Sequence, residues 1–176
     1  ISRPFAYFTF GLNYYFGGLE VFGYHVVNFI IHLLAALFLF LFLNETLRLP
    51  SLRDRYGEKA FVISFIATLL WAVNPVQVTS VTYLVQRMSS MAGLFFIMAM
   101  FFYVRGRTST SRTRAVTFFT LCVVAFLLAV GSKENAVMLP VILWLYDLFF
   151  IQGLTSRNIR KNIIILAPVV FSVIAI

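Results

Sequence analysis

Apolar residues occur along the chain in long runs that short polar clusters interrupt. The runs are about 14 to 20 residues long and lack the alternation of a β-strand. This length suits helices that cross a hydrocarbon layer about 30 Å thick. The expected crossings are residues 24–43, 60–73, 88–104, 115–130, 136–151 and 163–176. We therefore predict an all-α fold, a polytopic transmembrane helix bundle with about six membrane helices.

The first 23 residues differ from the rest of the chain. They are rich in Phe and Tyr and are interrupted by Gly11, Gly17 and Gly18. Aromatic rings concentrate at the level of the lipid headgroups. We therefore predict an external interfacial helix and loop over residues 1–23 and a transmembrane helical domain over residues 24–176. The chain opens on Ile1 and stops within an apolar run, so we expect truncation at both ends.

The composition excludes an ordinary soluble domain. Hydrophobic residues make up 61% of the chain and charged residues 11%, against about 45–50% and about 25% in soluble domains. A soluble core cannot bury that much apolar surface. The single cysteine, Cys122, lies within an apolar run, where we expect a buried hydrophobe and no disulfide within the chain.

The net charge of +8 matters through its location. Eleven basic residues follow the first, third and fifth crossings: Arg48, Arg53, Arg55, Lys59, Arg105, Arg107, Arg112, Arg114, Arg157, Arg160 and Lys161. The other three are Arg3, Arg87 and Lys133. Short loops with an excess of Lys and Arg stay in the cytoplasm. We therefore place these three residues on the non-cytoplasmic side, and we expect membrane lipid, not nucleic acid, as a partner.

The segment from Asn74 to Arg87 carries the first candidate binding residue. Asn74 is expected to cap a helix that Pro75 begins. Arg87 stands at the mouth of a crossing, where a guanidinium can bind a phosphate through two hydrogen bonds. The alternative is an interfacial arginine whose side chain reaches the headgroups.

The short loop at Lys133 and Glu134 is the second candidate. Ser132 is the expected cap of the next helix, and Glu134 falls in its favourable first turn. Charges this close to hydrocarbon are functional candidates. The alternative is a local cap beside a lysine that reaches toward the headgroups.

His25, Asn28 and His32 are spaced as i, i+3 and i+7, so they share one face of the first crossing. We expect this polar stripe to face other helices rather than lipid. Two histidines without further ligands are a poor metal signature, so we predict no metal site among these residues. The main interpretation is helix packing, with His25 near the outer mouth the better functional candidate.

Three groups of residues occur in an order that resembles a known family. They are Ser2-Arg3-Pro4 with Leu12-Asn13-Tyr14 and Gly23-Tyr24-His25, then Asn74-Pro75 with Gln86-Arg87, then Ser132-Lys133-Glu134-Asn135 with Tyr146-Asp147. Together they resemble the motifs of the transmembrane, TPR-containing O-mannosyltransferases and their bacterial relatives. The resemblance covers about residues 2–150.

This resemblance implies a membrane glycosyltransferase of the GT-C type. Such an enzyme takes a sugar from a polyprenyl-phosphate donor and transfers it to an acceptor, here a protein hydroxyl, on the non-cytoplasmic side. The family's acidic base precedes the Ser-Arg-Pro motif, which begins here at Ser2, so we expect the catalytic base upstream of Ile1. The TPR repeats that would bind the acceptor are expected after the membrane domain. The fragment alone is therefore expected to be inactive, and the resemblance leaves a divalent metal open.

The resemblance also suggests roles for individual residues. Arg87 and Lys133 are the expected ligands of the lipid phosphate. Glu134 is expected to orient Lys133 or to bind sugar hydroxyls. Arg3 and His25 are expected to line the same outer pocket.

A different class of function stays open. The chain can instead be a non-catalytic membrane scaffold or a lipid-handling module of a TPR protein. A transporter is disfavoured because no crossing carries a charge near its centre. Asn74 and Gln86 stand where His and Gly are expected in the animal enzymes, so a bacterial inner membrane is favoured over the endoplasmic reticulum.

Overall fold

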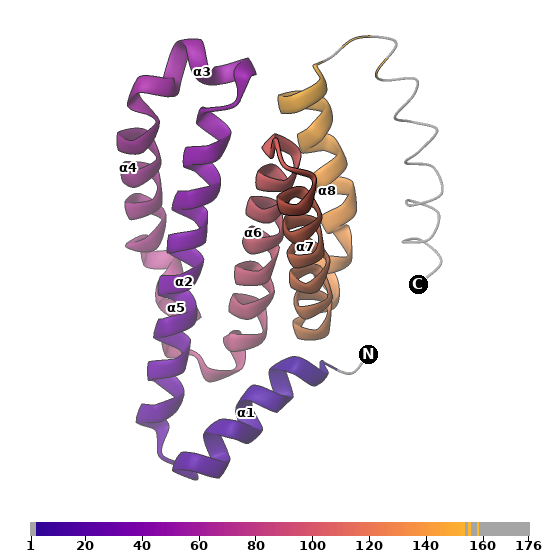
Figure 1. Ribbon diagram of the computed structural model, residues 1–176. Coiled ribbons are helices and arrows are strands. Elements are labelled where there is room, and N and C mark those ends of the chain that lie inside the picture. Colours follow the sequence, from indigo (N-terminus) through magenta and orange to yellow (C-terminus); the bar gives the residue numbers. More distant parts are fainter. Residues whose placement is uncertain (1–2, 154, 156–157, 159–176) are drawn as a thin grey trace.

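The computed structural model describes residues 3–153, 155 and 158, and every regular element in that part of the chain is helical. The helices are α1 (Pro4–Gly17), α2 (Val21–Leu47), α3 (Pro50–Tyr56), α4 (Ala60–Ala72), α5 (Val78–Thr82), α6 (Arg87–Thr108), α7 (Arg112–Ser132) and α8 (Leu139–Tyr146). Long helices run up and down beside one another, while α1 lies across one end of the bundle and α3 across the other (Figure 1). A π-helical turn, Asp147–Gln152, continues α8.

The long helices match the predicted crossings. Four helical stretches are long and apolar enough to span a membrane, and a fifth span results if the bent pair of residues 50–72 and 75–82 counts as one. The predicted all-α polytopic bundle is therefore confirmed, with four to five spans rather than about six in the described residues. The sixth predicted crossing, residues 163–176, lies outside them. The interfacial placement of residues 1–23 stays a prediction, although α1 is helical and exposes several aromatic rings.

Small side chains let the helices approach one another closely. Ala60, Ser64 and Thr68 recur every fourth residue on α4 and form its buried face against α2. On α7, Cys122, Ala125 and Ala129 recur at helical spacing and are buried in the same way, α6 being the main neighbour of this helix. Cys122 is 6% exposed, as expected for a buried hydrophobe.

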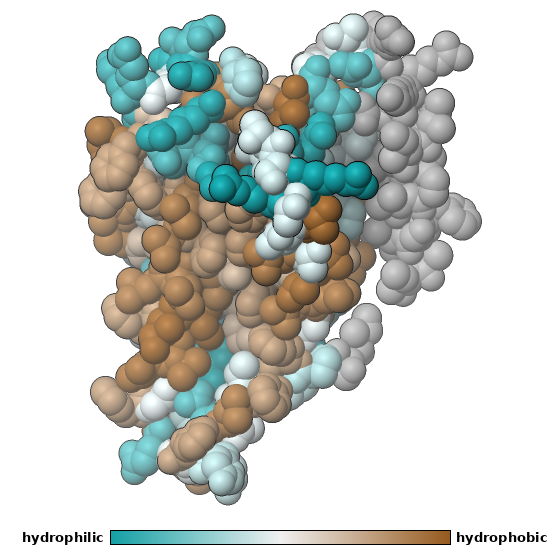
Figure 2. Space-filling model, viewed as in Figure 1, coloured by the Kyte–Doolittle hydropathy of each residue, from teal (hydrophilic) through white to brown (hydrophobic). Residues whose placement is uncertain are grey.

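Charge separates the two ends of the bundle. Eight of the basic residues predicted to be cytoplasmic gather at one end, here called the basic end: Arg48, Arg53, Arg55, Lys59, Arg105, Arg107, Arg112 and Arg114. Arg3, Arg87 and Lys133 lie at the opposite end, here called the α1 end. Figure 2 shows hydrophilic surface at both ends and a hydrophobic belt between them. The fold therefore brings together, at one end of the bundle, basic residues that lie in different loops of the sequence.

The chain bends by 54° between α4 and α5, where Pro75 follows Asn74. Asn74 Oδ1 accepts a hydrogen bond from the backbone N–H of Val76 at 3.0 Å, so the predicted cap is confirmed. In a continuous helix that N–H would pair with the carbonyl of Ala72. The break therefore leaves the Ala72 carbonyl without its helical partner.

The polar stripe on α2 satisfies the carbonyls that this irregular segment leaves free. His32 Nε2 lies 3.0 Å from the Ala72 carbonyl oxygen, and because a carbonyl only accepts, Nε2 carries the proton. Farther out, His25 Nδ1 and Asn28 Nδ2 lie 3.2 and 3.3 Å from the carbonyl of Val81. Asn28 and His32 are buried, so the prediction that they face other helices is confirmed.

Candidate functional site

A cluster of charged side chains occupies the α1 end, and we call Arg3, Lys133 and Glu134 the charged cluster. Arg3 donates two hydrogen bonds to Glu134, from Nη2 to Oε1 at 2.7 Å and from Nε to Oε2 at 3.0 Å. Arg3 Nη1 also lies 3.4 Å from the sulfur of Met88, on the first turn of α6. Three sequence segments that lie far apart therefore meet here.

Lys133 joins the same place because the backbone turns sharply at this residue. Its extended conformation, φ −158° and ψ 136°, separates α7 from the 3-10 turn Glu134–Met138. Its Nζ donates to Ser89 Oγ on α6 at 2.8 Å. Ser132 instead donates back to the carbonyl of Leu128 at 2.8 Å and is the last residue of α7, so the prediction that Ser132 caps the next helix is wrong.

The charged cluster is accessible. The side chains of Arg3 and Glu134 are 32% and 37% exposed. The hydrogen bond with Glu134 raises the pKa of Arg3 above its ordinary value, so this guanidinium stays charged. Two cations and one carboxylate leave the cluster with a net positive charge, which suits an anionic group.

Arg87 is held differently, because its side chain is fully buried, with 0% exposure. Its guanidinium donates to Asn28 Oδ1 at 2.7 Å, to Asn13 Oδ1 at 2.6 Å, to the Tyr24 carbonyl at 3.0 Å and to the Thr9 carbonyl at 3.4 Å. The guanidinium carbon also lies 4.5 Å from the centre of the Phe10 ring. All three guanidinium nitrogens are therefore occupied by α1 and α2.

This geometry favours a different role for Arg87 from the one expected. This guanidinium is fully buried and commits four of its five N–H donors to α1 and α2, which leaves no pair of donors to bind a phosphate through two hydrogen bonds. The predicted role of Arg87 as a ligand of the lipid phosphate stays a prediction. In this structure Arg87 joins α1 and α2 to the start of α6. Because Arg3 directly precedes α1, these bonds also fix the position of Arg3.

His25 has no contact with the charged cluster in the part of the chain that the structure describes. Its Nδ1 lies 3.2 Å from the Val81 carbonyl oxygen, and because a carbonyl only accepts, Nδ1 is the donor. The structure therefore brings Arg3, Lys133 and Glu134 together. Arg87 is buried and contacts α1 and α2 instead. His25 contacts the Val81 carbonyl on α5.

A cavity of about 160 Å³ opens beside the charged cluster. It lies among α2, α4, α5 and α6, and the residues that line it are His32, Ala35, Trp71, Gln77, Ser80, Gln86, Ser89, Ser90, Gly93, Leu94 and Ile97. Ser89 belongs to both places, because it lines the cavity and accepts from Lys133. Ser89 and Ser90 are not predicted from the sequence, where their position just after Gln86 and Arg87 on one helical turn is the signal that points to them.

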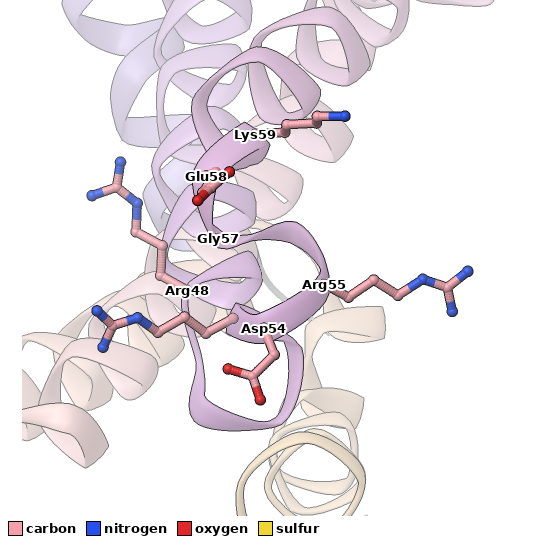
Figure 3. Close-up of a pocket in the computed structure, with 7 residues that line it drawn as sticks. Arg48, Asp54, Arg55, Gly57, Glu58 and Lys59 are labelled. Atoms are coloured by element: carbon pink, nitrogen blue, oxygen red, sulfur yellow. The ribbon is translucent and has the colours of Figure 1, made fainter.

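A larger hollow lies at the basic end and has a different character. It measures about 700 Å³ and is lined by Arg48, Arg53, Asp54, Arg55, Gly57, Glu58 and Lys59. Figure 3 shows Arg55 and Lys59 extending to one side of the ribbon and Arg48 to the other. Because these side chains point away from one another, they do not surround a common binding position.

Two carboxylates elsewhere, Glu45 and Asp147, form ion pairs with Arg105 and Arg107. Asp147, which is buried at the basic end, accepts from Arg107 Nε at 2.7 Å and from the Tyr103 hydroxyl at 3.0 Å. Among residues 3–153, 155 and 158, no group of three His, Cys, Asp or Glu side chains lies close enough to hold a metal ion.

Comparisons with known proteins agree with the resemblance. The chain is 31% identical over 162 residues to human protein O-mannosyl-transferase TMTC1, 29% identical over 155 residues to human TMTC3, and 31% identical over 163 residues to protein O-mannosyl-transferase F38B6.6 of Caenorhabditis elegans. These alignments cover 89%, 87% and 92% of the chain. The chain is related to the TMTC protein O-mannosyl-transferases. The suspected family is thus confirmed.

The chain spans only 17%, 15% and 20% of the length of these three TMTC relatives. No family model matches it, and no solved structure matches it. The three relatives are animal proteins, so they give no support to the expectation of a bacterial inner membrane. The helices establish a multi-pass membrane protein, and the roles of individual site residues stay proposals.

Proposed function

We propose that this chain is the membrane part of a glycosyltransferase that moves a sugar from a polyprenyl-phosphate donor to a protein hydroxyl. The observation that carries the proposal is the accessible charged cluster at the α1 end, in a chain related to O-mannosyl-transferases. By the positive-inside rule this end faces away from the cytoplasm. Transfer then takes place at the non-cytoplasmic surface.

The chemistry requires a base and a stabilised leaving group. A carboxylate must accept the proton of the acceptor hydroxyl as that oxygen attacks the sugar carbon. The bond from the sugar to the phosphate oxygen breaks, and a cation must stabilise the charge that develops on the phosphate. Lys133 is the best-placed cation, because its ammonium group is held on Ser89 at the rim of the cavity.

Glu134 and Arg3 have supporting roles in this scheme. Glu134 is committed to Arg3 by two hydrogen bonds, so it orients Arg3 rather than acting as the base. Arg3 contributes the second positive charge that faces the phosphate. We expect the base, and the TPR repeats that bind the acceptor, in the part of the protein that lies outside this chain.

Sugar transfer by variants of the full-length protein tests the proposal. Lys133→Met keeps the aliphatic stem and removes the charge, and we expect transfer to fall about 100-fold, as when one preorganised donor is removed from a developing anion. Lys133→Arg keeps the charge and should retain much more activity. The matched control is Lys59→Met, which removes an exposed lysine at the basic end. Wild-type transfer by Lys133→Met would contradict the proposal.

A further inference from the structure

The cavity beside Lys133 is left open by a glycine. Gly93 lies in the interior of α6 and lines the cavity, and a methyl group built on it would meet no atom within 4 Å. Glycine weakens a helix relative to alanine, so its use in a helix interior needs a reason. Close packing is not that reason here, because no neighbour approaches Gly93. Gly93 is exposed, and the missing side chain leaves open space along this wall of the cavity.

The lining changes from polar to apolar with depth. Along α6 from the α1 end, the lining residues are Ser89 and Ser90, then Gly93 and Leu94, then Ile97. The irregular segments on either side of α5 add Gln77 and Gln86 near the mouth. On the opposite wall α2 adds Ala35 and His32, whose Nε2 is bonded to the Ala72 carbonyl and whose ring is stacked on Trp71 of α4. A ligand that fills this space therefore needs a polar head and a slender apolar tail.

The mouth offers free hydrogen-bond donors. The amide oxygen of Gln77 accepts from Ser80 at 3.2 Å, and that of Gln86 accepts from Ser89 at 3.1 Å. In the described residues the amide nitrogen of neither glutamine has a hydrogen-bond partner. With the ammonium group of Lys133 on Ser89, these nitrogens provide donors without a competing carboxylate on the cavity wall. A phosphate, whose oxygens only accept when ionised, suits such a mouth.

We propose that this cavity holds the head of the lipid carrier, with the phosphate at Gln77, Gln86 and Lys133 and the first part of the single prenyl chain over Gly93. The inference rests on the proposed function and adds the residues that recognise the lipid. A sugar ring alone would leave its hydroxyls against Leu94 and Ile97 without partners. A bilayer phospholipid carries two chains, which a cavity of about 160 Å³ does not hold together.

Equilibrium binding of radiolabelled geranylgeranyl phosphate to the purified full-length protein tests this inference without measuring sugar transfer. We expect Gly93→Leu to weaken binding by about tenfold or more, because the added side chain fills the space that the prenyl chain needs. Gly93→Ala should fold normally and weaken binding less, since its methyl group meets no neighbour. Gly11→Leu is the matched control, because a side chain there also meets nothing within 4 Å and Gly11 lies on α1, outside the cavity.

Competition identifies the ligand chemistry. Inorganic phosphate lacks the prenyl chain, and geranylgeraniol lacks the phosphate. We therefore expect each to bind at least about tenfold more weakly than unlabelled geranylgeranyl phosphate when it competes with the radiolabelled ligand. Equal binding by wild type and Gly93→Leu, or equal competition by phosphatidylglycerol, would overturn the cavity assignment. Either result could be obtained while the wild-type protein still transfers sugar, so failure of this inference is distinguishable from failure of the proposed function.

Discussion

Arg87 shows how one buried charge can organise the α1 end. Asn13 and Asn28 both direct their side-chain oxygens at its guanidinium, at 2.6 and 2.7 Å, so the two amides on α1 and α2 depend on it. A buried charge is stable only when hydrogen bonds replace its lost water. The planar fork of arginine allows one side chain to reach all of these acceptors, which the single ammonium group of lysine cannot do.

Replacing Arg87 should therefore loosen α1. We expect Arg87→Met to lower the free energy of unfolding by about 2–3 kcal/mol, because buried acceptors lose a charged donor. Arg87→Lys should recover only part of this loss. Thermal unfolding in detergent measures the effect, with Arg112→Met, at an exposed position of the basic end, as the control. Equal melting temperatures for Arg87→Met and Arg112→Met would exclude the structural role.

At the scale of elements, the break between α4 and α5 and the polar stripe of α2 depend on each other. Asn74 Oδ1 accepts from the N–H of Val76. His32 Nε2 donates to the carbonyl of Ala72, which this N–H would pair with in a continuous helix. Inside a membrane an unpaired carbonyl is costly, so a broken helix needs a neighbour with polar side chains. The break in turn places Gln77 and Ser80 at the mouth of the cavity.

A double-mutant cycle tests this dependence. His32→Leu alone should cost about 1–3 kcal/mol in unfolding free energy, because the Ala72 carbonyl loses its partner. When Asn74 and Pro75 are both replaced by alanine, Val76 can donate to Ala72 again, and the cost of His32→Leu should fall by about 1 kcal/mol. Strictly additive effects would show that the two features are independent.

The sequence predicts the helices well but the contacts between them poorly. The length of the apolar runs predicts the helices, and Asn74 beside Pro75 predicts the cap, because both are local properties. The polar spacing on α2 shows that Asn28 and His32 face inward, but the carbonyls that they meet belong to segments 40 and 53 residues away. The acceptors of Arg87 could not be predicted for the same reason, since they lie on α1 and α2, and a role of Arg87 in phosphate binding stays a prediction. The cavity cannot be predicted from the sequence, because serines within an apolar helix are ordinary residues.

On the scale of the whole molecule, the two ends of the bundle differ in the number and arrangement of their charged residues. The basic end carries exposed arginines, and one of them, Arg107, pairs with the buried Asp147 and so joins α6 to the turn that continues α8. The α1 end carries fewer charges, and one of them, Lys133, reaches Ser89 on the rim of a cavity. An enzyme that uses a membrane lipid as donor needs such an arrangement on one face only. The proposed function therefore requires that the α1 end lies on the non-cytoplasmic face of the membrane.

Cysteine labelling measures this directly. In a full-length protein whose Cys122 and other cysteines are replaced, Asn135→Cys places a thiol beside Glu134, and Thr110→Cys places one between α6 and α7 at the basic end; both positions are exposed. Sealed membrane vesicles of known orientation are treated with a membrane-impermeant maleimide. We predict labelling of Asn135→Cys from the non-cytoplasmic face and of Thr110→Cys from the cytoplasmic face. The reverse pattern would contradict the account.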